Sequence, residues 1–109
     1  MDNTTSIQMG RRLELQKLLE DVLGSKNVYF EPPPSLMMKY PCIRYKRARY
    51  DAQYADDRPY KLVSRYELTF IYRDPDNETV YQLAQLPMCA QDRHYTADNL
   101  SHDVFTLSY

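Results

Sequence analysis

The residues with the clearest capacity for chemistry lie close together in the last fifth of the chain. Two histidines stand among three aspartates there, in the order Asp92, His94, Asp98, His102 and Asp103. Imidazole and carboxylate groups at short spacing can bind a metal or transfer protons. The two histidines flank a predicted turn, so their proximity depends on a strand register that the sequence leaves open. Because each histidine has an aspartate within two positions, we interpret the cluster as a hydrogen-bonded turn or surface.

Signatures of known catalytic and cofactor sites do not occur in the rest of the sequence. Gly10 and Gly24 are the only glycines, which excludes the Gly-rich phosphate-binding loops. Cys42 and Cys89 do not form a CxxC pair, and both stand in apolar, strand-like surroundings typical of buried thiols. We therefore expect no enzyme activity, no catalytic residue, no metal and no cofactor.

A basic strip is the second feature that suggests a function. It consists of Arg44, Lys46, Arg47 and Arg49, with tyrosines interleaved. Cations bind phosphates and aromatic rings stack on bases, so a small nucleic-acid-binding module is one interpretation. The acidic pI of about 6.1 disfavours it, because dedicated nucleic-acid domains carry a clear basic excess. A strip of salt bridges between proteins is the interpretation we favour.

Charge is divided unevenly along the chain. From Lys39 to Arg65 there are eight basic and three acidic residues, whereas from Asp74 onward there are six acidic residues and only Arg93 as a basic one. These could be two solvated faces, or complementary faces of neighbouring copies in a ring. The 11 tyrosines, against three phenylalanines and no tryptophan, suit half-buried sheet faces and subunit contacts.

The elements that must position these residues follow from periodicity. With 109 residues, of which 43% are hydrophobic and 27% charged, the chain fits one globular domain spanning 1–109. The expected elements are helices over 6–23 and 75–86 and strands over 28–30, 40–49, 63–73, 88–96 and 103–109. This order, α-β-β-β-α-β-β, predicts an α+β fold with a mostly antiparallel sheet of four to five strands and two helices on one face.

Individual faces can also be predicted. An apolar stripe on the first helix faces the core (Leu15, Leu18, Leu19, Val22), and Gly24 is placed for a left-handed C-terminal stop. Alternate residues of the strongest strand share the inner face (Tyr66, Leu68, Phe70, Tyr72). In the strand before it, Ile43 and Tyr45 point inward. On the second helix, Asp74 is the expected cap and Val80, Leu83 and Ala84 the expected core residues.

Two segments are expected to lack regular structure. Residues 1–5 should be flexible. Residues 50–61 show no amphipathic period and contain Asp56, Asp57 and Pro59, which predicts a long polar loop. Such a loop should be mobile in a monomer and ordered by a partner. No stretch is apolar enough to span a membrane and the N-terminus lacks a signal-peptide pattern, so we expect cytoplasmic synthesis and no membrane partner.

Three sequence motifs carry a resemblance to a known family. They are 40–47 (YPCIRYKR), 54–57 (YADD) and 92–105 (DRHYTADNLSHDVF). Over roughly residues 28–109 the chain resembles short structural proteins of tailed bacteriophages, specifically siphophage proteins near the head–tail joint. The element order is similar to that of tail terminator, or tail completion, proteins. Other neck, head-completion and minor capsid proteins share small α+β designs and remain alternatives.

The resemblance implies a virion protein at the junction of tail and neck. It implies a ring, expected to be a homo-hexamer, seated on the tail tube protein beneath a head-completion or neck protein. Genomic DNA would pass through the lumen without sequence-specific binding. The candidate interface residues come from the charged clusters and the polar loop: Arg44, Lys46, Arg47, Arg49, Tyr54, Asp56, Asp57, Arg58, Asp98 and Asp103.

Overall fold

One five-stranded sheet with two helices forms the core of the protein. The computed structural model describes residues 11–55 and 58–109, with 50–55 and 58–63 described by the backbone alone. The elements are α1 (Arg12–Leu23), β1 (Val28–Phe30), β2 (Cys42–Ala55), β3 (Arg58–Tyr72), α2 (Thr79–Ala84), β4 (Cys89–Ala97) and β5 (Leu100–Ser108). The predicted α+β class and element order are confirmed.

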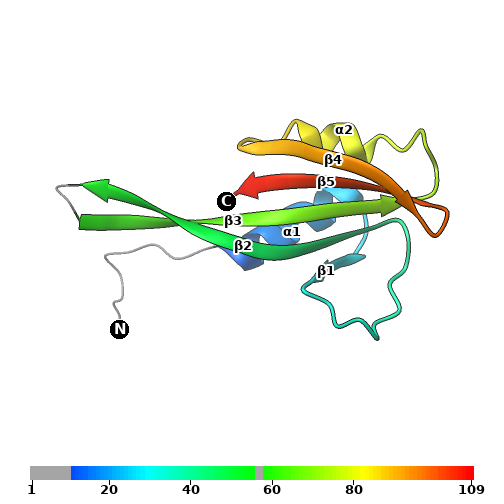
Figure 1. The fold of residues 1–109 in the computed structure, drawn as a ribbon, viewed down its shortest axis with the longest axis horizontal. Coiled ribbons are helices and arrows are strands. Elements are labelled where there is room, and N and C mark those ends of the chain that lie inside the picture. The colour runs from blue at the N-terminus through cyan, green and yellow to red at the C-terminus, as the bar shows by residue number, and fades with distance from the viewer. Residues whose placement is uncertain (1–10, 56–57) are drawn as a thin grey trace.

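The sheet has the strand order β1-β2-β3-β5-β4 (Figure 1). Every pairing is antiparallel except that of β1 with β2, which is parallel. The last hairpin therefore inserts β5 beside β3 and leaves β4 at the edge. The sequence predicted a mostly antiparallel sheet, but it did not predict this spatial order or the parallel pair.

The main core lies between the sheet and the helices. Leu15 and Leu19 of α1 and Leu83 of α2 are fully buried in one cluster with Tyr45 and Phe70. The inner faces predicted for β2 and β3 are confirmed, and β5 adds two more buried side chains, Phe105 and Leu107. On α2 the prediction was wrong for one residue, because Ala84 is exposed.

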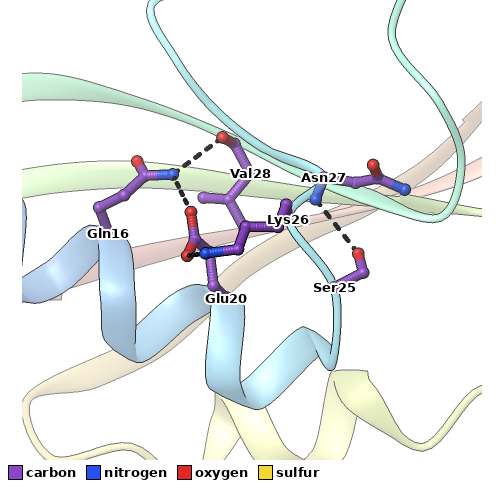
Figure 2. A network of polar contacts seen from close by, with 6 residues as sticks. All are labelled: Gln16, Glu20, Ser25, Lys26, Asn27 and Val28. Carbon is purple, nitrogen blue, oxygen red and sulfur yellow. Dashed lines mark hydrogen bonds and ion pairs between the residues drawn. The ribbon is translucent and has the colours of Figure 1, made fainter.

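Polar contacts fix α1 against β1 (Figure 2). The Gln16 amide donates to the carbonyl of Val28 and to Glu20, both at 3.0 Å, and Lys26 reaches Glu20 at 3.4 Å. The amide oxygen of Gln16 in turn accepts the hydroxyl proton of Tyr45 at 2.6 Å. The helix is thus tied to both parallel strands at the point where the chain turns from α1 into β1.

The connections on either side of the helices follow local backbone chemistry. Gly24 ends α1 in the left-handed conformation (φ 78°), and its N–H bonds the Glu20 carbonyl at 2.8 Å, as predicted. The second helix begins later than expected, at Thr79 rather than near Asp74. Asn77 accepts the Thr79 N–H at 2.9 Å, while Asp74 closes a separate turn onto Asp76. Asp74 is therefore a turn residue and not the helix cap.

The prediction of a loop over 50–61 was wrong. Strand β2 continues to Ala55 and β3 begins at Arg58, so most of this segment belongs to a long hairpin. Asp56 and Asp57, and the residues 1–5 expected to be flexible, lie outside the described residues. Within the part of the chain that is described, no helix is long and apolar enough to cross a membrane.

Candidate functional site

The long β2–β3 hairpin projects beyond the rest of the sheet as an arm (Figure 1). Strand β1 pairs with residues 43–45 of β2, and strand β5 pairs with residues 65–72 of β3. Beyond those limits β2 and β3 pair only with each other among the described residues, out to Ala55 opposite Arg58. We call residues 50–55 with 58–64 the arm. The arm extends a molecule whose principal extents are 50 × 25 × 23 Å.

A β-bulge at the base of the arm rearranges the basic strip. The register shifts between Arg47 and Arg49, so that Arg49 lies opposite Arg65. An extra residue in one strand moves each later side chain to the other face of the sheet. Arg44, Lys46 and Arg49 therefore share the face away from the helices, whereas Arg47 lies on the helix face.

The cations of the strip have different surroundings. Arg47 lies over the rings of Phe30 and Tyr66, at 5.7 and 5.8 Å from their centroids. Lys46 forms a surface ion pair with Glu67 at 3.7 Å, which contributes little to stability because both groups are hydrated. Arg44 is half-buried opposite Thr69. The strip is thus partly occupied in contacts within its own chain.

A groove of about 330 Å³ lies between β2 and the bend that follows β1. Its walls mix cations with carboxylates, and they include Glu31, Pro32, Arg44, Lys46, Glu67 and Thr69. Glu31 is held in place, because its carboxylate accepts the backbone N–H of Arg47 at 3.2 Å. A groove of mixed charge suits a polar protein segment better than a phosphate backbone, which needs a net positive surface.

The opposite edge of the sheet is strand β4, which is exposed along its length. Every residue from Ala90 to Ala97 is exposed, and only Cys89 is half-buried. Within the described residues β4 pairs with β5 alone. A second register shift, between Gln91 and Arg93, marks a bulge at Asp92. The molecule therefore ends on a nine-residue edge strand.

Asp103 is not a surface residue, contrary to the prediction that it contributes to an interface. It is only 3% exposed and accepts three hydrogen bonds on the helix face of the sheet. The Tyr72 hydroxyl donates at 2.5 Å, the Gln91 amide at 2.8 Å and the ring Nδ1 of His94 at 2.9 Å. Burial, together with the bond to Asp103, raises the pKa of Tyr72 to about 12, so this hydroxyl stays protonated at neutral pH.

The two histidines lie on opposite faces of the sheet, so they cannot act together. His94 is the direct cross-strand partner of Asp103 on the helix face. His102 is buried on the other face, where its ring stacks on Tyr95 at a centroid distance of 4.6 Å and its Nδ1 contacts the Leu100 carbonyl. The alternation of β5 could have identified Asp103 as inward, because it is in phase with Phe105 and Leu107.

The chemistry available to the remaining candidates is limited. Among the described residues, no group of three or more His, Cys, Asp or Glu side chains could hold a metal ion. Burial raises the pKa of both thiols, Cys42 and Cys89, to about 11, so both stay protonated at neutral pH. Asp103 orients the His94 imidazole, and among the described residues no nucleophilic side chain hydrogen-bonds to that ring.

The other predicted interface residues fall at the two ends of the molecule. Asp98 is exposed in the two-residue turn between β4 and β5, with φ 54°. Tyr54 and Arg58 belong to the arm, where their backbones pair with Pro59 and Ala55. The structure thus separates the predicted set into a basic strip, an arm and a turn at the far edge.

Comparisons of the chain with protein-family models, curated proteins and solved structures found no match.

Proposed function

We propose that this protein is a non-catalytic virion subunit, a tail terminator whose copies form a ring, expected to be a hexamer, at the end of a phage tail tube. The observation that carries the assembly part is the projecting β2–β3 arm. The place in the virion comes from the motifs over 40–47, 54–57 and 92–105 that resemble siphophage head–tail proteins. The ring would contact the tail tube protein below and a neck protein above.

The arm supports assembly because a two-stranded ribbon is marginally stable in water. Its strands are ordered at the base by β5 and by the core, but beyond Arg65 they have no third strand among the described residues. Ordering each backbone residue costs roughly 1–2 kcal/mol, which apolar burial must offset. A second molecule that covers the arm would supply that burial and additional backbone hydrogen bonds.

The presence of two different open edges favours a ring over a closed dimer. Head-to-tail contacts join two different surfaces of neighbouring copies and close into rings when the rotation permits. The arm and the β4 edge are such different surfaces, at different places on one sheet (Figure 1). The basic middle and acidic final third add complementary charge. DNA would then pass through the lumen without base readout.

The proposal is tested by shortening the arm. Joining Tyr50 to Ser64 through Asn-Gly removes residues 51–63 at a directly paired position and uses a favoured hairpin turn. Size-exclusion chromatography with light scattering should show a ring for the unmodified chain and monomers for the short-arm variant. The far-UV circular dichroism should be unchanged apart from the lost strands. The matched control replaces only Asp56 and Asp57 with Asn-Gly and should still assemble.

Two results would contradict the proposal. One is an unmodified chain that stays monomeric at every concentration and is absent from purified virions. The other is labelling of the protein in virions at a site other than the head–tail junction, by immunogold electron microscopy. Assembly of the short-arm variant at unchanged affinity would refute the role of the arm.

A nucleic-acid-binding module is the second candidate, and the bulge that places Arg44, Lys46 and Arg49 on one face favours it. The pairing of Lys46 with Glu67 and the carboxylates in the groove work against it. A gel-shift titration across salt concentrations separates the two functions. Binding that weakens steeply with salt and is lost on changing Arg44 and Arg49 to Gln would favour the module.

A further inference from the structure

The outer edge of β4 presents unpaired backbone groups in a defined pattern. In an antiparallel ladder, alternate residues turn N–H and C=O away from the partner strand. Ala97 and Leu100 close the two-residue turn at Asp98–Asn99, and the residues that close such a turn bond each other. Counting back from Ala97, Thr96 and His94 therefore direct their backbone groups to the open edge.

The edge strand is held rigidly on both faces of the sheet. On the helix face, the side chains of Gln91 and His94 bond the buried carboxylate of Asp103. On the other face, the ring of Tyr95 stacks on the buried His102 with an interplanar angle of 13°. A strand fixed in this way loses little further entropy when another strand pairs with it.

The arm carries a second open edge in the same molecule. At the base of the arm, the Ser64 carbonyl of β3 accepts the Tyr109 N–H at 3.0 Å. From Arg58 to Val63, β3 pairs on one side with β2 and, among the described residues, with no strand on the other. This six-residue edge is short enough to fit along the nine residues of β4.

The two edges also differ in charge. Residues 58–63 include Arg58 and Lys61 and no acidic residue. Strand β4 and its turn carry Asp92 and Asp98 against Arg93 alone, and Arg93 forms an ion pair with Asp92 at 2.7 Å, so the net acidic charge of this edge is that of Asp98. Opposite charges across adjacent strands favour pairing and fix its register.

We propose that residues 58–63 of the arm of one copy pair with the outer edge of β4 of the next copy, which continues the sheet between subunits. The partner is a second copy of this chain, bound through backbone hydrogen bonds as in other cases of strand addition. This inference rests on the proposed self-assembly and names the surface that receives the arm. Because the donor and the acceptor edges differ, the contact is head-to-tail and can close into a ring.

A proline substitution on the acceptor edge tests the pairing. Thr96→Pro removes one outward N–H while leaving the alternate bonds to β5 in place. We expect it to weaken assembly about tenfold or more in dissociation constant, the effect of one lost backbone hydrogen bond. The matched control Thr96→Val keeps the N–H and should assemble like the unmodified chain. Circular dichroism checks that each variant folds.

A photo-crosslinking amino acid at position 96 gives an independent result if Thr96→Pro fails to fold. Crosslinks mapped by mass spectrometry to residues 58–63 of another copy would support the inference. The inference would be overturned if position 96 crosslinked to β4 of another copy, crosslinked to any other segment, or gave no crosslink. Equal assembly of the Pro and Val variants would also overturn it. If the unmodified chain still forms a ring in those cases, only the strand pairing is refuted and the proposed function is not. If the unmodified chain never assembles, both the strand pairing and the proposed function are refuted.

Discussion

The buried carboxylate of Asp103 allows a quantitative test of how β4 is held to the sheet. Asp103→Ala removes the acceptor of three hydrogen bonds, but the three donors are affected differently. Gln91 is exposed and the His94 side chain is 49% exposed, so both can bind water instead. Tyr72 is 6% exposed, so its hydroxyl would lose its charged acceptor in the core and keep only the weaker contact with the Ser101 side chain beside it.

The expected loss of unfolding free energy follows from this difference in burial among the three donors. A hydrogen bond to a charged group contributes about 1.5–3 kcal/mol, and a buried donor left unpaired costs a further 1–3 kcal/mol or so. Asp103→Ala should therefore lower the free energy of unfolding by about 3–5 kcal/mol, a large part of the roughly 5–15 kcal/mol typical of a domain. Tyr72→Phe leaves the carboxylate with two donors and should cost only about 1–2 kcal/mol.

The double variant identifies the interaction. Because Tyr72→Phe removes the stranded hydroxyl, Asp103→Ala with Tyr72→Phe should be less destabilised than the sum of the two single variants, by about 1–3 kcal/mol. Urea unfolding of all four proteins, followed by circular dichroism at one protein concentration, measures this coupling. Additivity within about 0.5 kcal/mol would refute the reasoning. So would a loss below about 1 kcal/mol for Asp103→Ala, which is less than a single buried hydrogen bond.

Two further predictions concern alkaline pH and the end of α1. The pKa of Tyr72 is about 12 in the fold, above its usual value of about 10. The protonated hydroxyl therefore contributes to stability below about pH 10, and this contribution is lost as the pH rises to about 12. The unfolding free energy of Tyr72→Phe should fall less than that of the unmodified chain across this range, and equal losses would contradict the assignment. Gly24→Ala should cost about 1–2 kcal/mol through its positive φ alone, because a Cβ there meets nothing within 4 Å. A thermal melt checks this, with Gly24→Asn expected to lose less; an unchanged melting temperature would contradict it.

The parts of the fold that sequence could predict are those in which a side chain faces a core. The alternation from Tyr66 to Tyr72 identified the inner face of β3, and the stripe containing Leu15 and Leu19 identified the buried side of α1. In both, burial of one face imposes a period on the sequence. The same rule extends to Asp103, whose position in phase with Phe105 marks it as inward although its charge suggests the surface.

The arm could not be predicted in this way. Beyond the end of β5 no third strand or helix among the described residues covers it, so no core imposes a hydrophobic period on 50–61. The ladder from Tyr50 to Ala55 is specified by backbone bonds that continue from the anchored half of the hairpin. The parallel pairing of β1 with β2 was also beyond prediction, because three residues carry too little pattern to fix a direction.

The wrong prediction of a loop at the arm is informative about function as well as about structure. In a sequence that specifies one fold, local propensity, hydrophobic pattern and packing all favour that fold. A segment in which they disagree is expected where selection acts on something other than the fold of the monomer. At 50–61 a composition typical of a loop adopts a strand conformation that extends past its own sheet. The register of that strand is set by buried neighbours such as Ile43 opposite Phe70, so the arm leaves the core with its open edge already oriented. An arm that is positioned accurately, but is not covered by the described part of its own chain, is what the proposed head-to-tail contact requires. The polar sequence of the arm is consistent with this proposal, because an exposed apolar edge favours non-specific aggregation over the proposed ring.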